Sequence, residues 1–121
     1  MTPATASIAR RLSLHPAWRW MDGANALRWA PGLRDHLTVG YRVDENLRRS
    51  GFIGELVPDL DDAATIGTVE EQVRAVIPQA VLWPPENTGE SWVINFGILD
   101  HLAEGATRGE AWVNAFLEWH K

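Results

Sequence analysis

The spacing of apolar residues predicts helices at both ends of this 121-residue chain and another near its middle. Near the N-terminus, Ile8 and Leu12 lie four residues apart, which is the spacing of one face of a helix. Thr5 or Ser7 is a candidate N-cap for this helix, and Pro16 should stop it near residue 15. The chain therefore begins with a short predicted helix.

The segment 17–43 indicates one or two strands rather than a helix. In places its large apolar residues recur at every second position, as Leu37, Val39, Tyr41 and Val43 do. Residues that favour turns or bulges interrupt the segment, namely Gly23, Pro31, Gly32 and Gly40. Short strands separated by turns are the expected structure.

The segment 58–78 predicts the best-defined helix of the central region. Four apolar residues recur on one face, namely Ile66, Val69, Val73 and Val76. Three aspartates at its start offer caps and a favourable charge for the helix dipole, namely Asp59, Asp61 and Asp62. Pro78 should end the helix. Gly67 weakens it by about 1 kcal/mol relative to alanine, so we expect close packing against a neighbour at this glycine.

The segments 79–83 and 91–99 predict two strands that pair as a hairpin around a loop rich in turn residues. In the second strand we expect one face to belong to the core, formed by Trp92, Ile94, Phe96 and Ile98. Further on, Thr107 and Glu110 have the spacing of a capping box. An amphipathic C-terminal helix should follow, with its apolar face formed by Trp112, Phe116 and Trp119.

The order helix, strands, helix, hairpin, helix is typical of the α+β class. We therefore predict a single α+β domain over residues 1–121, with a small antiparallel sheet and helices packed on one of its faces. Its apolar fraction of 45% and charged fraction of 22% suit one globular core.

Composition excludes several kinds of chemistry. The chain has no cysteine, so a disulfide, a thiolate zinc site and a cysteine nucleophile are impossible. The four histidines are too scattered to form a local ligand pair, and no nucleotide-binding or hydrolase signature occurs. The aspartates at 59, 61 and 62 could gather a cation, but helix capping explains all three. We expect no metal, no cofactor and no catalytic motif.

The first residues contain no continuous apolar stretch of the length found in a signal peptide, and no apolar run approaches a membrane span of about 20 residues. These observations predict a soluble, cytoplasmic protein without a membrane partner.

Seven tryptophans and an uneven charge distribution raise the question of binding. Trp18, Trp20 and Trp29 are interleaved with arginines, a composition that can bind single-stranded nucleic acid. A net charge of −5 opposes phosphate binding, so a role in the core is favoured for these rings and a nucleic-acid partner is not expected. Residues 1–50 hold eight basic and four acidic residues, whereas the remainder holds three and twelve. Such a dipole can steer a charged partner, or the two halves can attract each other.

Two places are candidates for contact with a partner protein. Arg48 and Arg49, beside Ser50 and Gly51, indicate an exposed loop whose guanidinium groups could bind carboxylates or phosphates. Trp83 precedes a loop that begins with two prolines, and an aromatic residue at such a loop can anchor an interface. A position in the hairpin core is the alternative for Trp83. The complete predicted set of partner-binding residues is Arg42, Arg48, Arg49, Trp83 and Glu86.

Three segments of the chain stand out as motifs: the start HPAWRWM at 15–21, the helix entry PDLDDAATIG at 58–67, and the Trp-bearing strand followed by the Gly-Glu-Ala at 109–111. In these segments the chain resembles a group of small proteins from phage and prophage genomes. The group commonly has proline where Ala63 stands, and the segment 24–52 lies outside the resemblance. The resemblance implies a genomic setting rather than a mechanism.

We therefore predict a phage accessory protein that binds another protein in the cytoplasm of the bacterial host. The prediction rests on the small size of the chain, its lack of catalytic motifs, its uneven charge and the phage setting that the resemblance implies. Inhibition of a host defence complex, in the manner of an anti-CRISPR protein, is the leading form of this hypothesis. A structural or assembly protein of the phage particle is one alternative. A small enzyme that uses dispersed carboxylates and arginines is another. The sequence leaves the partner and the oligomeric state open.

Overall fold

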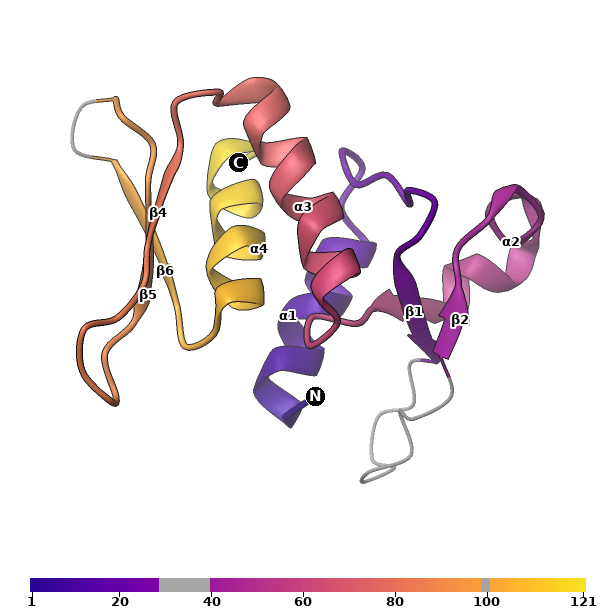
Figure 1. Cartoon of the computed structure of the whole chain (residues 1–121). Coiled ribbons are helices and arrows are strands. Elements are labelled where there is room, and N and C mark those ends of the chain that lie inside the picture. The colour runs from indigo at the N-terminus through magenta and orange to yellow at the C-terminus, as the bar shows by residue number, and fades with distance from the viewer. Residues whose placement is uncertain (29–39, 99–100) are drawn as a thin grey trace. The chain divides into compact units, whose positions relative to one another are not determined.

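The computed structural model describes residues 1–28, 40–98 and 101–121. Contacts between residues divide the chain into two compact units, residues 1–65 and 66–121, and each is described by itself (Figure 1). The described strands form two antiparallel sheets of three strands each, accompanied by helices. The predicted α+β class is confirmed, although the strands are shared between two sheets instead of one.

The first unit combines a sheet of order β2-β1-β3 with three helical segments. Its elements are α1 (Pro3–Ser13), β1 (Asn25–Arg28), β2 (Gly40–Arg42), α2 (Glu45–Arg49), the 3-10 helix η1 (Gly51–Glu55) and β3 (Leu56–Pro58). β1 pairs antiparallel with both of its neighbours. Helix α1 packs on β3 and buries Ala6, Ala9 and Leu12.

The N-terminal helix is confirmed, but its predicted N-caps are wrong. Thr2 is the N-cap, and its Oγ1 accepts a hydrogen bond from the backbone N of Thr5 at 3.1 Å. Pro3 suits the first helical turn because no hydrogen bond is required from its nitrogen there. Both Thr5 and Ser7 consequently lie inside the helix.

The turn at Gly23 is confirmed, since its φ of 88° is a conformation that favours glycine. Gly40 is neither a turn nor a bulge, because it lies in β2 and pairs with Leu27. The predictions for Leu37, Val39, Pro31 and Gly32 fall outside the described residues.

The second unit contains most of α3 (Ala63–Val76), followed by β4 (Val81–Trp83), β5 (Trp92–Asn95), β6 (Leu102–Gly105) and α4 (Arg108–Trp119). The sheet order is β4-β5-β6, antiparallel throughout. The predicted hairpin is confirmed as β4 and β5. Strand β6 was not predicted.

Helix α3 begins later than predicted because Pro58 belongs to β3. Asp62 caps it, and its carboxylate accepts from the backbone N of Thr65 at 3.0 Å and from the hydroxyl at 2.8 Å. The predicted capping role is therefore confirmed for Asp62.

The buried face of α3 includes Ile66, Val69 and Val73, as predicted. Val76 is 42% exposed, and Ile77, the residue after the helix, is buried instead. The expected close packing at Gly67 is wrong, because a Cβ placed there would meet no atom within 4 Å. This glycine leaves an open position on the helix surface.

Helix α4 begins as the capping-box spacing predicts. Thr107 Oγ1 accepts from the backbone N of Glu110 at 3.1 Å, and the Glu110 carboxylate accepts from the backbone N of Ala106 at 3.0 Å. Trp112 and Phe116 are buried, as expected. Trp119 at the last position of the helix is 43% exposed, which corrects the prediction of a core role.

Candidate functional site

The two faces of the β4–β5–β6 sheet have different environments. The register places Val81, Asn95 and Leu102 in one cross-strand row, and Trp83, Val93 and Glu104 in a second row on the same face. The row Leu82, Ile94 and Ala103 points to the opposite side. Helix α4 packs along β5 and β6 (Figure 1), and Ile94 and Ala103 are buried. The sheet therefore has an inner face with the helix on it.

We call the other side the outer face, formed by Val81, Trp83, Val93, Asn95, Leu102 and Glu104. Three of its apolar side chains are about half exposed, with Trp83 at 49%, Val81 at 48% and Leu102 at 45%. The solvent-facing side of an antiparallel sheet is usually polar, whereas four of these six residues are apolar. Exposed apolar side chains gathered on one face of a sheet make that face a candidate surface for binding a partner.

Trp83 is the predicted site residue that lies on this face. It ends β4 and stands opposite Val93 of β5. The alternative of a position in the hairpin core is not what the structure shows, because about half of the residue is exposed. In contrast, Val81 and Leu102 were not predicted as site residues.

The loop 84–91 follows Trp83 and carries Glu86 in an exposed position. The carboxylate of Glu90 organises this loop. It accepts from the backbone N of Glu86 at 3.2 Å, from the backbone N of Asn87 at 3.3 Å and from Asn87 Nδ2 at 2.9 Å. Glu86 is thus held through its backbone, while its side chain extends into solvent.

These hydrogen bonds lower the pKa of Glu90, first through the Asn87 side chain and then through the two backbone groups. A depressed pKa in the folded state contributes stability above the ordinary value of 4.5, and that stability is lost as pH falls through the lowered pKa. We expect a carboxyl-carbon NMR titration of Glu90 to show a midpoint below 4.5, and Asn87→Ala to raise it. Thr88→Ala, in the same loop, should leave it unchanged. A wild-type midpoint at or above 4.5 would contradict this assignment.

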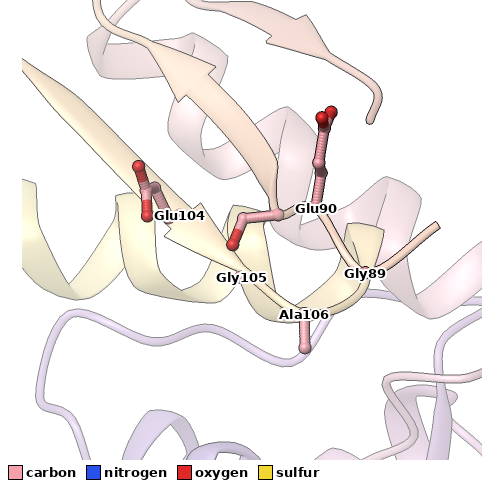
Figure 2. Close-up of a pocket in the computed structure, with 6 residues that line it drawn as sticks. Gly89, Glu90, Glu104, Gly105 and Ala106 are labelled. Carbon is pink, nitrogen blue, oxygen red and sulfur yellow. The ribbon is translucent and has the colours of Figure 1, made fainter. Parts of the chain in front are cut away.

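A shallow, open hollow of about 340 Å³ lies beside this loop, at the end of β6. Figure 2 shows the carboxyl groups of Glu90 and Glu104 on the separate segments that border it. A general acid at neutral pH requires a raised pKa, whereas that of Glu90 is lowered. The hollow therefore exposes carboxylates to solvent, and Glu90 does not have the raised pKa that a general acid requires.

The interpretation of Arg48 and Arg49 as parts of a loop is wrong. Both lie in α2, a short helix that Asp44 caps by accepting from the backbone N of Leu47 at 2.8 Å. Arg48 forms an ion pair with Asp22, and Arg49 forms one with Glu45 at 2.7 Å. Both guanidinium groups therefore meet carboxylates of their own chain.

Arg42 also has partners within the first unit. Its Nη1 donates to the carbonyl of Gly23 at 2.7 Å and lies 3.3 Å from Asp62 Oδ2. Burial raises the pKa of Asp62, but hydrogen bonds from Thr65 and the Arg42 guanidinium bring it below its usual value. The three predicted arginines thus belong to residues 1–65, whereas Trp83 and Glu86 belong to residues 66–121.

The tryptophans near the N-terminus have structural partners. Trp18 is 8% exposed, and its ring meets that of Trp20 edge to face, with 5.5 Å between centroids. This agrees with the favoured core role over base stacking. Trp29 falls outside the described residues.

Within residues 1–28, 40–98 and 101–121, no group of three or more acidic or histidine side chains is arranged to hold a metal ion. None of the helices in these ranges has both the length and the apolar character of a membrane span. No protein-family model matches the chain, and no curated protein or solved structure is significantly similar to it.

Proposed function

We propose that this protein works by binding another protein and that the outer face of the β4–β5–β6 sheet is its contact surface. The observation that carries the proposal is the exposure of Val81, Trp83 and Leu102 together on one side of a sheet. Among the described residues, six of the seven exposed large apolar side chains lie in residues 66–121, and only Leu14 lies elsewhere. Among the described residues, the exposed large apolar side chains are therefore concentrated in the second unit.

Trp83 is the proposed anchor of this contact. Tryptophan is enriched among the few interface residues that contribute most of a binding energy, and such residues need neighbours that exclude water. Val81 and Val93 flank Trp83 on the same face. Because the anchor stands on a paired strand, it is positioned before the partner arrives, which reduces the entropy lost on binding.

In the setting that the resemblance implies, the partner is a bacterial host protein, and the chain is a phage accessory protein that acts in the host cytoplasm. Obstruction of a host defence complex, as by an anti-CRISPR protein, is the proposed role. Such obstruction requires an exposed binding surface and no active site. The outer face supplies such a surface.

The proposal predicts that Trp83→Ser weakens partner binding at least tenfold, since burial of a tryptophan contributes more than the roughly 1.4 kcal/mol that corresponds to this factor. The tagged protein is used to recover host proteins at micromolar concentration, and the affinity of the recovered partner is measured by calorimetry. Val76→Ser is the matched control, because Val76 is similarly exposed but lies on α3. It should bind like the wild type.

Both variants alter exposed residues and should melt within a few degrees of the parent. A partner that binds Trp83→Ser as tightly as the wild type would show that the surface is assigned wrongly. Recovery of no specific partner would overturn the proposed function itself.

A further inference from the structure

The net charge of the chain resides in the unit that contains the outer face. Residues 66–121 hold three basic and eight acidic residues, a net charge of −5, which is that of the whole chain. Residues 1–65 hold eight basic and eight acidic residues. The second unit is therefore markedly acidic, and the first is balanced.

All three cations of the second unit are already engaged in ion pairs. Arg74 and Arg108 both contact Glu70, at 3.3 and 3.5 Å, and Lys121 contacts Glu118 at 2.9 Å. No ion pair connects Glu86, Glu90 or Glu104 to any residue that the structure describes. The carboxylates that lack a counter-ion thus include those beside the outer face.

The position of these carboxylates matters more than their number. Glu104 stands on the outer face itself, in the row of Trp83 and Val93. Glu86 and Glu90 lie in the loop that begins directly after Trp83. An apolar strip that includes an exposed indole is therefore bordered by anionic groups.

We propose that the outer face binds a basic amphipathic segment of its partner, in which apolar side chains are flanked by lysine or arginine. This inference rests on the proposed function and specifies the chemistry of the partner. The apolar side chains would cover Val81, Val93 and Leu102. The cations would form charge-assisted hydrogen bonds with Glu104 and Glu86 and could stack on the exposed ring of Trp83.

The same charges disfavour the other occupants. A second copy of the chain, packed face to face, would bring its own Glu104 and its acidic loop against like charges. The phosphates of a nucleic acid would meet the same repulsion. A basic protein segment is the occupant that complements both the apolar strip and the carboxylates.

The test uses three labelled synthetic peptides of about 14 residues, which is roughly four turns of helix. In the first, leucines form one face and lysines the other. In the second, glutamate replaces each lysine, and in the third, serine does. Binding to the full chain is followed by fluorescence anisotropy. The lysine peptide should bind at least roughly tenfold more tightly than each of the others.

Two pairs of variants separate a specific contact from general attraction between opposite charges. Glu104→Gln should weaken binding of the lysine peptide about threefold, which is typical of one exposed charge contact. Glu71→Gln removes the same charge from α3 and should change the affinity little. Trp83→Ser should weaken binding roughly tenfold or more, whereas Val76→Ser should not.

Each result has a distinct consequence. Equal weakening by Glu104→Gln and Glu71→Gln, or no measurable binding of the lysine peptide, would overturn the inference. If the serine peptide binds as tightly as the lysine peptide and Trp83→Ser abolishes both, the preference for a basic segment is wrong, but the outer face remains a binding surface. If no peptide responds to Trp83→Ser, both this inference and the surface assignment fail.

Discussion

Replacement of Gly105 by alanine is expected to destabilise the second unit by about 3 kcal/mol, at the upper end of the usual effect of overpacking. Gly105 lies in β6, and a Cβ there would collide with the backbone of Glu110 and Ala111 in α4. A flexible side chain could move aside, but the backbone of a helical turn cannot do so without losing its hydrogen bonds. Strand β6 and α4 must therefore separate to admit one methyl group.

Urea unfolding followed by circular dichroism measures this loss, and amide hydrogen exchange in residues 66–121 assigns it to the second unit. Gly67→Ala is the matched control. It adds the same methyl group to α3 at a position where no atom lies within 4 Å of the new Cβ. This variant should instead raise the free energy of unfolding by roughly 0.5–1 kcal/mol. If Gly105→Ala unfolds at the same urea concentration as the wild type, the close approach of β6 and α4 is refuted.

The elements predicted correctly from the sequence are those with strong local signals. Helix α4 begins at a Thr and a Glu at capping-box spacing. Thr107 makes the expected contact, whereas the Glu110 carboxylate accepts from the backbone N of Ala106, one residue before the N-cap. The hairpin of β4 and β5 follows from apolar alternation on either side of a loop rich in turn residues. Each of these signals lies in one continuous stretch of the sequence, so no knowledge of distant contacts is needed.

Strand β6 could not be predicted in the same way. Its sequence, LAEG, is short, contains a glycine and has little intrinsic strand preference. It is a strand because it pairs with β5, from Trp92 opposite Gly105 to Asn95 opposite Leu102. Tertiary pairing overrides local preference in this segment, and the exposure of Leu102 on the outer face could not be foreseen without it.

The arginines illustrate a second limit. Adjacent arginines near Ser50 and Gly51 are compatible with an open loop, but Asp44 caps a helical turn, and Asp22 supplies an ion-pair partner from far along the chain. An ion-pair partner so far away in the sequence cannot be recognised from the residues next to the arginine. The end of a strand at Trp83, by contrast, follows from a local signal, because two prolines come directly after it; its role in partner binding stays a prediction.

Trp112→Ala is expected to have the largest effect on stability, a loss of about 4 kcal/mol, typical of a buried tryptophan truncated to alanine. The indole of Trp112 in α4 is fully buried. The guanidinium of Arg74 in α3 lies over it, 5.2 Å from the ring centroid, and donates from Nη1 to the carbonyl of Ala80 at 2.6 Å. Loss of the ring would therefore remove core volume and also the surface on which Arg74 rests.

Trp112→Phe is the informative companion, because the indole N–H of Trp112 is buried without an acceptor among the described residues. An unsatisfied buried donor costs roughly 1–3 kcal/mol, so its removal should offset much of the lost ring volume. We expect Trp112→Phe to lose only about 1 kcal/mol in urea unfolding and to bind the lysine peptide like the wild type, since the outer face is unchanged. If alanine and phenylalanine at this position prove equally destabilising, the expectation that removing an unsatisfied donor offsets the lost ring volume is wrong.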